Sequence, residues 1–273
     1  MSVSTTYTAP RATVIGRLRG RARRGGLGLG LATLYLSVIV LIPLAAVVAK
    51  AFSGGISEFF DSVTTSTTLE TLGATLLAAA VVAVIGAVMG TLIAWVQVRD
   101  RYPGQRLVNS LIDLPFALPS IVAGLTLIAL YGPRSPFGIH LVYTRAAVYV
   151  AMLFVTLPFV VRSVQPVLME LDPEVEEAAA SLGASNLTTF RRIVLPALRP
   201  AIISGAALAF ARAVGEFGAL VLVVGRINIA SIVVFADIEN DSTAAAASLS
   251  VILLVISLGI LFALRRLGGQ GAG

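Results

Sequence analysis

Long apolar runs dominate the hydrophobic pattern of this 273-residue chain. A helix that crosses a bilayer needs roughly 20 mostly apolar residues, and six runs reach that length. Three of them contain no charged residue: Leu27–Ala49, Thr71–Val98 and Ser242–Leu264. No run alternates with the period of two that is typical of a membrane barrel strand. The pattern therefore predicts an all-α polytopic membrane protein with six transmembrane helices.

The other three runs carry ionisable residues. They extend from about Leu107 to Tyr131, from Ala146 to Met169 and from Pro200 to Val224. The first contains Asp113, the second Arg162, and the third both Arg212 and Glu216. Charged groups are costly inside a membrane and are by default candidates for function. Arg162 is near the end of its run, so its side chain is expected to snorkel to the surface.

Basic residues are unevenly divided between the connections that join these runs. Fourteen arginines lie in the N-terminal tail, in the loops after the second and fourth runs and at the C-terminal end, whereas the other connections hold four basic residues. Because cytoplasmic connections are enriched in Lys and Arg, we expect both termini to be cytoplasmic. The net charge of +6 follows from this topology. The expected surroundings are membrane lipid, and no nucleic-acid partner is expected.

The chain divides into four segments by composition. Residues 1–24 are rich in Arg, Ser, Thr and Ala, which is typical of disorder, and we interpret them as a basic cytoplasmic tail; an arm that binds nucleic acid or anionic lipid is the alternative. The first transmembrane helix is expected at 25–51, and its apolar run is too long for a signal peptide. A membrane core at 69–266 and a cytoplasmic tail at 267–273 follow.

The composition excludes several kinds of active site. The chain has no cysteine and one histidine, His140, which excludes thiolate metal sites, iron–sulfur clusters and histidine-rich metal centres. No G-x-x-x-x-G-K-[ST] sequence is present, and Lys50 is the only lysine. We therefore expect no catalytic residue, metal or cofactor on this chain, and any ATP hydrolysis must belong to another polypeptide.

The connection after the fourth run, residues 170–199, predicts two short helices. Asp172 is a favourable N-cap, Pro173 suits the first helical position, and Gly183 supplies a stop. Apolar side chains between them fall on one helix face, at Val175, Ala178, Ala179 and Leu182. A second helix is expected to begin after Ser185 and to end before Pro196. An apolar stripe on so short a helix is suited to a groove on a partner.

The same segment resembles the EAA loop of ABC-importer permeases, in which EAA is followed after three residues by G and after nine more by I-x-L-P. The matching positions are Glu177, Ala178, Ala179, Gly183, Ile193, Leu195 and Pro196. The resemblance implies a type I ABC-importer permease fold with this loop as the coupling helix. It also implies two ATP-binding cassette ATPase subunits, a second homologous permease subunit and an extracytoplasmic binding protein as partners.

Other stretches are similar to the sulfate and thiosulfate permeases of that superfamily. They are Asp113–Pro119 with Val122–Thr126, Pro158–Pro166, and Ala211–Gly218. The resemblance implies translocation of sulfate or thiosulfate, delivered by a sulfate-binding protein, across the bacterial cytoplasmic membrane. Molybdate or tungstate transport is the alternative within the superfamily. After Gly225 the chain reads Arg-Ile-Asn-Ile-Ala, which departs from the Asn-Ile-Pro-like turn expected there.

Two features are candidates for the translocation path. Arg212 and Glu216 are four residues apart, so they can pair on one helix face. The pair has either a structural role or a transport role. In the transport role Arg212 lines an anion route, and Glu216 limits how tightly Arg212 holds the anion. Pro115 and Pro119 remove backbone hydrogen bonds, which gives either a broken helix beside the path or a plain kink. Asp113 either caps this helix or pairs with a cytoplasmic arginine.

Small residues in the second run indicate close helix packing, because Gly86 and Gly90 have the G-x-x-x-G spacing. A stand-alone channel or ion-driven carrier is the alternative from a different class. It would explain the six runs and the intramembrane charges, but not the EAA loop.

Overall fold

The computed structural model describes residues 28–269, which are almost entirely helical. The first described helix covers Gly28–Ala51 and includes a π-helical turn, η1. The elements from this turn onward are η1 Ser37–Leu41, α2 Ile42–Ala51, α3 Ile56–Val63, α4 Ser66–Arg99, α5 Gln105–Ala117, α6 Ser120–Tyr131, α7 Arg145–Glu170, α8 Pro173–Ser181, α9 Asn186–Thr189, η2 Phe190–Val194, α10 Leu195–Val214, α11 Leu220–Val223, α12 Ala230–Glu239 and α13 Thr243–Gly269.

Five of the described helices are long and apolar enough to cross a bilayer: Gly28–Ala51, Ser66–Arg99, Arg145–Glu170, Asn186–Val214 and Thr243–Leu264. The helices α5 and α6 make a sixth span if they are counted together, although they meet at a bend of 119°. On that count the six predicted spans are confirmed. The break between α5 and α6 is the broken helix expected from Pro115 and Pro119, and a plain kink is excluded.

Of the described residues, 28–49 belong to a unit separate from the rest of the chain. Its described part is an apolar helix whose side chains are almost all exposed. An apolar surface of this kind is stable in water only when it is covered, which agrees with a position in lipid. The predicted basic tail at 1–24 lies outside the described residues. At the other terminus α13 continues to Gly269, into the predicted tail at 267–273.

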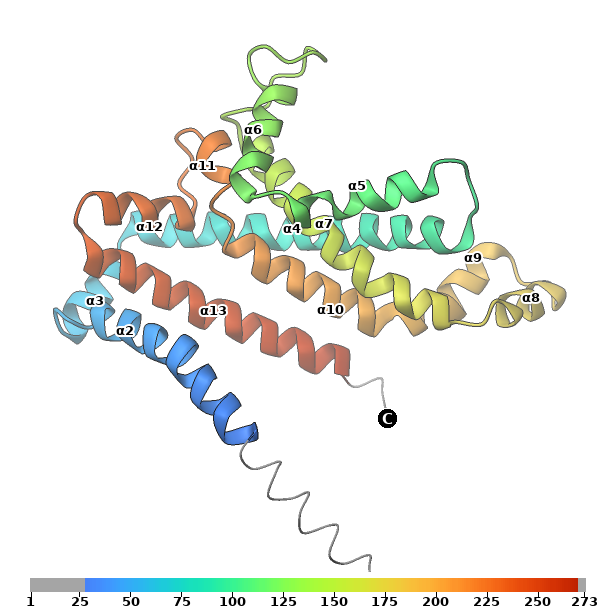
Figure 1. Cartoon of the computed structure of the whole chain (residues 1–273), viewed down its shortest axis with the longest axis horizontal. Helices are drawn as coiled ribbons and strands as arrows, with labels where there is room; N and C mark the ends of the chain where they lie inside the picture. Colours follow the sequence, from blue (N-terminus) through green and yellow to red (C-terminus); the bar gives the residue numbers. More distant parts are fainter. Residues whose placement is uncertain (1–27, 270–273) are drawn as a thin grey trace, which may run out of the picture. The chain divides into compact units, whose positions relative to one another are not determined.

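The second unit begins at Lys50 and is built around four long helices. In Figure 1, α4, α7 and α10 run beside one another and α13 packs along α10. Buried Met152, Val155 and Phe210 belong to one part of the core, and buried Val160 and Leu198 belong to another. At one end of these helices lie α8 and α9, and at the other lie α3 and α12 (Figure 1). We call the second of these the far end.

Glycines bring three of these helices into close contact at Val160 of α7. A Cβ atom on Gly90 of α4 would lie 2.8 Å from the Val160 Cβ atom, and one on Gly205 of α10 would lie 2.9 Å from the Val160 Cα atom. The predicted close approach at the G-x-x-x-G pair is therefore confirmed at Gly90. Both glycines therefore lie directly against Val160 of α7.

Replacement of Gly205 by alanine is expected to destabilise the fold, because the new methyl group meets the backbone of α7, which cannot move aside cheaply. The cost should be about 1–3 kcal/mol, visible as a lower melting temperature of the protein purified in detergent. Gly259→Ala is the matched control, since its Cβ atom would meet nothing within 4 Å. Equal melting temperatures for the two variants would contradict the close packing.

The structure corrects the predicted fifth span, which ends at Val214 rather than Val224. Gly215 follows this helix, and the apolar residues beyond it form the short helix α11. The helix α12, which the sequence analysis did not predict, packs on α13 beyond the break. Arg212 is therefore in the last turn of α10, and Glu216 is beyond the end of that helix.

The expected helix end before Pro196 is wrong. Asn186–Val214 is one continuous helix, and Pro196 is inside it. A proline removes one backbone donor and crowds the preceding turn, and here the wider π-helical turn η2 comes immediately before it. Within that turn the Leu195 N–H donates to the Phe190 carbonyl oxygen.

Candidate functional site

The helix α8 has both of its predicted ends. The Asp172 carboxylate accepts a hydrogen bond of 3.0 Å from the Glu174 N–H, and Pro173 is the first helical residue. At the other end the Gly183 N–H donates to the Ala180 carbonyl and the Ala184 N–H donates to the Ala179 carbonyl. This is a Schellman motif. Gly183 has a φ of +84°, which explains why glycine suits this position.

The predicted apolar stripe of α8 is uncovered by the described part of the chain. Val175 is 44% exposed and Leu182 is 90% exposed, and Leu187 of α9 is 64% exposed. Glu177 and Ala178 are exposed as well, whereas Ala179 is partly buried. Three large apolar side chains in water are unfavourable for an isolated chain, so the stripe is a candidate contact surface.

An ion pair fixes α8 to the end of α4. The Arg99 guanidinium donates to the Glu176 carboxylate at 2.6 Å and to the Leu171 carbonyl at 3.1 Å. Both charged side chains are mostly buried, with 17% and 20% exposure. The sequence analysis counted Arg99 only as a topological charge, so this contact was missed. These contacts attach α8 directly to α4.

The last part of the EAA-like pattern lies in the helix that leads into the bundle. Ile193 is part of η2, and Leu195 and Pro196 begin α10. The buried Val194 between them packs in the same core as Val160. The pattern thus joins an exposed stripe to a continuous helix that enters the core.

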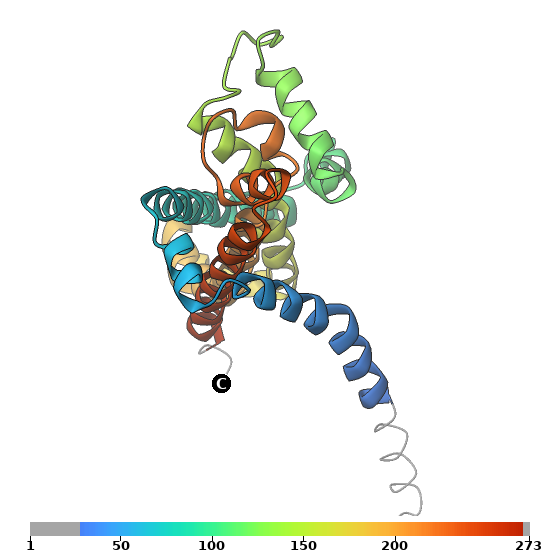
Figure 2. The ribbon, with the colours of Figure 1, turned by 90° about the vertical axis from the view of Figure 1, so that its left-hand side faces the viewer.

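The two broken helices meet each other. The break before α6 contains Pro119, and the break after α10 runs from Gly215 to Ala219. A Cβ atom on Gly218 would lie 2.7 Å from the Ser120 Cβ atom, and one on Gly124 would lie 2.8 Å from the Ala219 carbonyl oxygen. Figure 2 shows α6 beside α11. We call this contact between the breaks the junction.

Arg212 and Glu216 lie at the junction. The Arg212 guanidinium forms an ion pair of 2.5 Å with the Glu216 carboxylate and donates a hydrogen bond of 3.0 Å to the Ser120 hydroxyl. The second carboxylate oxygen of Glu216 accepts from the Ala219 N–H at 2.8 Å. The Ser231 hydroxyl donates to the Glu216 backbone carbonyl at 2.6 Å. Glu216 thereby ties together the break, α10 and α12.

The burial of the two partners is unequal. Glu216 is fully buried, whereas the Arg212 side chain is 33% exposed. A buried carboxylate without a cation is strongly unfavourable, so the pair has a structural role. A third of the Arg212 side chain is nevertheless accessible, and its role in an anion route stays a prediction.

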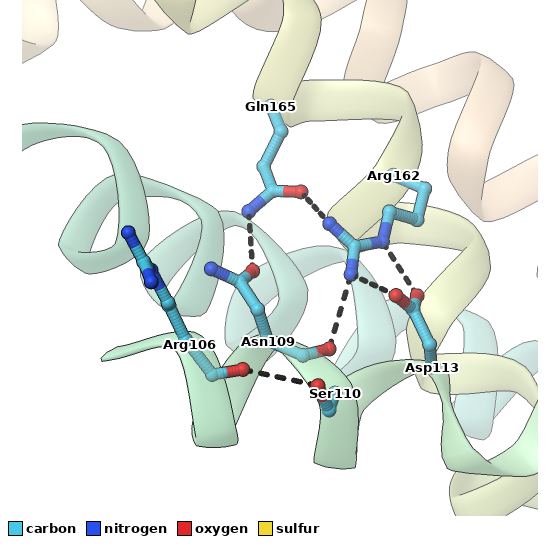
Figure 3. A network of polar contacts seen from close by, with 6 residues as sticks. All are labelled: Arg106, Asn109, Ser110, Asp113, Arg162 and Gln165. Carbon is cyan, nitrogen blue, oxygen red and sulfur yellow. Dashed lines mark hydrogen bonds and ion pairs between the residues drawn. The ribbon is translucent and has the colours of Figure 1, made fainter. Parts of the chain in front are cut away.

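Asp113 is engaged elsewhere. Its carboxylate accepts hydrogen bonds of 2.7 and 2.5 Å from Arg162. It therefore pairs with an arginine inside the predicted fourth span, rather than with one from a cytoplasmic connection. Arg162 also donates to the Asn109 carbonyl and to the Gln165 side chain (Figure 3). This network holds the Arg162 guanidinium between α5 and α7, and its expected snorkelling stays a prediction.

The predicted path residues thus separate into two places. Arg212, Glu216 and Pro119 belong to the junction. Asp113 and Pro115 lie on α5, where Asp113 binds α7. The residues Ser120, Asn109 and Gln165 were missed, since uncharged polar side chains gave no signal in the pattern of apolar runs.

Comparison with protein families gives a match over most of the bundle. The model of the family described as "Binding-protein-dependent transport system inner membrane component" matches residues 86–266. This range includes both halves of the junction and all of the α8–α9 segment.

Curated relatives are similar along most of the chain. The "Sulfate transport system permease protein CysT" of Synechocystis sp. is 43% identical over 249 residues, covering 87% of this chain and 87% of that protein. The protein of the same name from Salmonella typhimurium is 42% identical over 252 residues, covering 88% of this chain and 91% of the relative.

Solved structures share the fold at lower identity. A chain of a bacterial ABC transporter involved in the import of alginate aligns with a TM-score of 0.75 at 16% identity, covering 94% of this chain and all of that one. A chain of the MetNI methionine ABC transporter in an inward-facing conformation gives a TM-score of 0.60 at 21% identity, covering 75% of this chain and 96% of the other.

Proposed function

Because the chain belongs to the family of inner membrane components of binding-protein-dependent transport systems, we propose that it is the permease subunit of an ATP-driven importer for sulfate or thiosulfate. The observation that carries the proposal is the exposed stripe on α8, which has the residue spacing of an EAA loop and is joined to the bundle by Arg99. The named sulfate-transport relatives, at about 42–43% identity over most of the chain, support the substrate.

The proposed assembly pairs this chain with a second permease subunit, two ATPase subunits and an extracytoplasmic sulfate-binding protein. ATP hydrolysis belongs to the ATPase subunits, because the sequence has no P-loop. The stripe on α8 docks on the ATPase subunit at the cytoplasmic side of the membrane. The far end of α4 and α7 then faces the binding protein.

A continuous helix carries movement of the ATPase to the junction. Asn186–Val214 is continuous, so about 40 Å of helix separates the coupling segment from Arg212 at 1.5 Å per residue. A tilt imposed on α9 displaces the guanidinium against Ser120 at the start of α6. In this proposal the partly exposed Arg212 side chain binds the anion, and Glu216 prevents tight retention.

Uptake of radiolabelled sulfate tests the function. The chain, its sibling permease, the ATPase and the binding protein are expressed in a host that lacks its own sulfate uptake. We expect uptake that is lost when either the ATPase or the binding protein is omitted. Uptake that persists without the ATPase would indicate the channel or carrier, and competition by molybdate but not by thiosulfate would indicate the molybdate alternative.

Cysteine labelling tests the orientation, because the chain has no cysteine of its own. A cysteine at Asn240 should react with a membrane-impermeant thiol reagent added outside intact cells, whereas cysteines at Arg101 and Asn186 should react only after the cells are opened. All three positions are exposed in the structure, so failure to label reports the membrane side. The reverse labelling pattern would contradict the cytoplasmic location of the α8–α9 segment.

A further inference from the structure

A groove of about 600 Å³ lies at the far end, between the beginnings of α4 and α7 and the loop that joins α11 to α12. We call it the far-end groove. Each segment contributes polar or charged side chains: Glu70 from α4, Arg145 and Tyr149 from α7, and Arg226 and Asn228 from the loop. The segment Arg226–Asn228 is the place where the sequence departs from the sulfate-permease pattern.

The groove is built on the side of the bundle opposite to the coupling loop. Glu70 and Arg99 are at opposite ends of α4, and Arg99 binds α8. At 1.5 Å per residue the two positions are about 44 Å apart, which exceeds the roughly 30 Å thickness of the hydrocarbon core. If α8 docks on a cytoplasmic ATPase, the groove opens to the outside.

Backbone contacts hold the loop in place on both sides. The Tyr143 N–H donates to the Val223 carbonyl at 2.9 Å, which fixes the start of the loop beside the start of α7. The Ala230 N–H donates to the Thr75 hydroxyl of α4 at 2.9 Å, which fixes its end. Arg226 on this loop and Arg145 at the start of α7 therefore line the same groove.

The guanidinium groups of Arg145 and Arg226 are free to bind an anion. Neither Arg145 nor Arg226 forms an ion pair with another residue in the range 28–269. Both are exposed, and Glu70 is the single acid among the residues that line the groove. A concave surface with unpaired cations raises the local concentration of anions.

We propose that the far-end groove is a capture site for a tetrahedral divalent oxyanion, which it holds between release from the binding protein and arrival at Arg212. This assignment rests on the proposed function. Two guanidinium groups match the two charges of the anion and donate several hydrogen bonds. The Asn228 amide and the Tyr149 hydroxyl supply further donors. Glu70 repels the anion, so the site binds weakly and releases readily.

Equilibrium binding of radiolabelled sulfate to the complete transporter in nanodiscs, without binding protein, tests the assignment. Arg145→Gln and Arg226→Gln should each weaken sulfate binding about two- to fivefold, as expected for exposed charges, and the effect should shrink at high salt. Glu70→Gln should strengthen binding. Arg134→Gln is the control, since Arg134 is exposed in the loop after α6 and does not line the groove.

Three results would overturn the capture site. One is unchanged sulfate binding in both arginine variants, and another is an equal loss in Arg134→Gln. The third is normal sulfate binding with a weakened affinity for the binding protein, which would make the groove a protein docking surface. Molybdate is used as a second probe, so the groove is tested even if wild-type uptake shows that sulfate is not the transported anion.

Discussion

Leu182→Asp is expected to abolish sulfate uptake while leaving the permease folded and in the membrane. Leu182 is 90% exposed and at the end of α8, so a carboxylate there costs no packing within the chain. In the proposed complex the same side chain is buried against the ATPase, where an unpaired charge is costly. Co-purification with the ATPase and binding-protein-dependent uptake should fall together by at least an order of magnitude.

Asn186→Asp is the matched control for this substitution. It adds the same charge to an exposed position on the next helix, where a carboxylate at the helix N-terminus is favourable. Its uptake should remain near that of the wild type. Normal ATPase association of Leu182→Asp would remove α8 from the proposed interface.

The second large effect is a loss of folded protein when either charge at the junction is removed. The loss should be greater for the Arg212 variant than for the Glu216 variant. Arg212→Met leaves the fully buried Glu216 carboxylate without its cation, at a cost of about 3–5 kcal/mol. Glu216→Gln leaves Arg212 unpaired, but that side chain is 33% exposed and is partly solvated. The glutamine can still accept the hydrogen bond from Ala219. The yield of folded protein should therefore fall more for Arg212→Met than for Glu216→Gln.

The double variant Arg212→Met with Glu216→Gln separates the structural role from the transport role. Its folded yield should recover toward the wild type, because no buried charge is left unpaired. If Arg212 contacts the anion as proposed, uptake should stay lost despite the recovered fold. Wild-type yield together with wild-type uptake would leave the pair with a structural role alone.

The apolar runs predicted the long helices because a transmembrane segment is defined by length and hydropathy, which are local properties. The ends of α8 were predictable for a similar reason, since Asp172 and Gly183 act on neighbouring backbone groups. The end of α10 was not, because apolar residues continue from Leu220 to Val224 and hide the break at Gly215.

The contacts between distant segments also could not be predicted from the sequence. Asp113 and Arg162 are 49 residues apart, and Arg212 and Ser120 are 92 residues apart. Nothing in the spacing of either pair indicates a contact, because packing of helices in space selects the partners. The intramembrane charges were correctly identified as notable, but their partners required the structure.

The contact of Gly90 and Gly205 with Val160 limits which motions the transporter has available. Helices this close cannot slide or rotate past one another without a clash, so α4, α7 and α10 behave as one lever with few internal degrees of freedom. Flexing is then concentrated where backbone hydrogen bonding is interrupted, at the breaks before α6 and after α10. The motion that this packing leaves available is tilting of a stiff body about the two adjacent breaks, rather than rearrangement of its core.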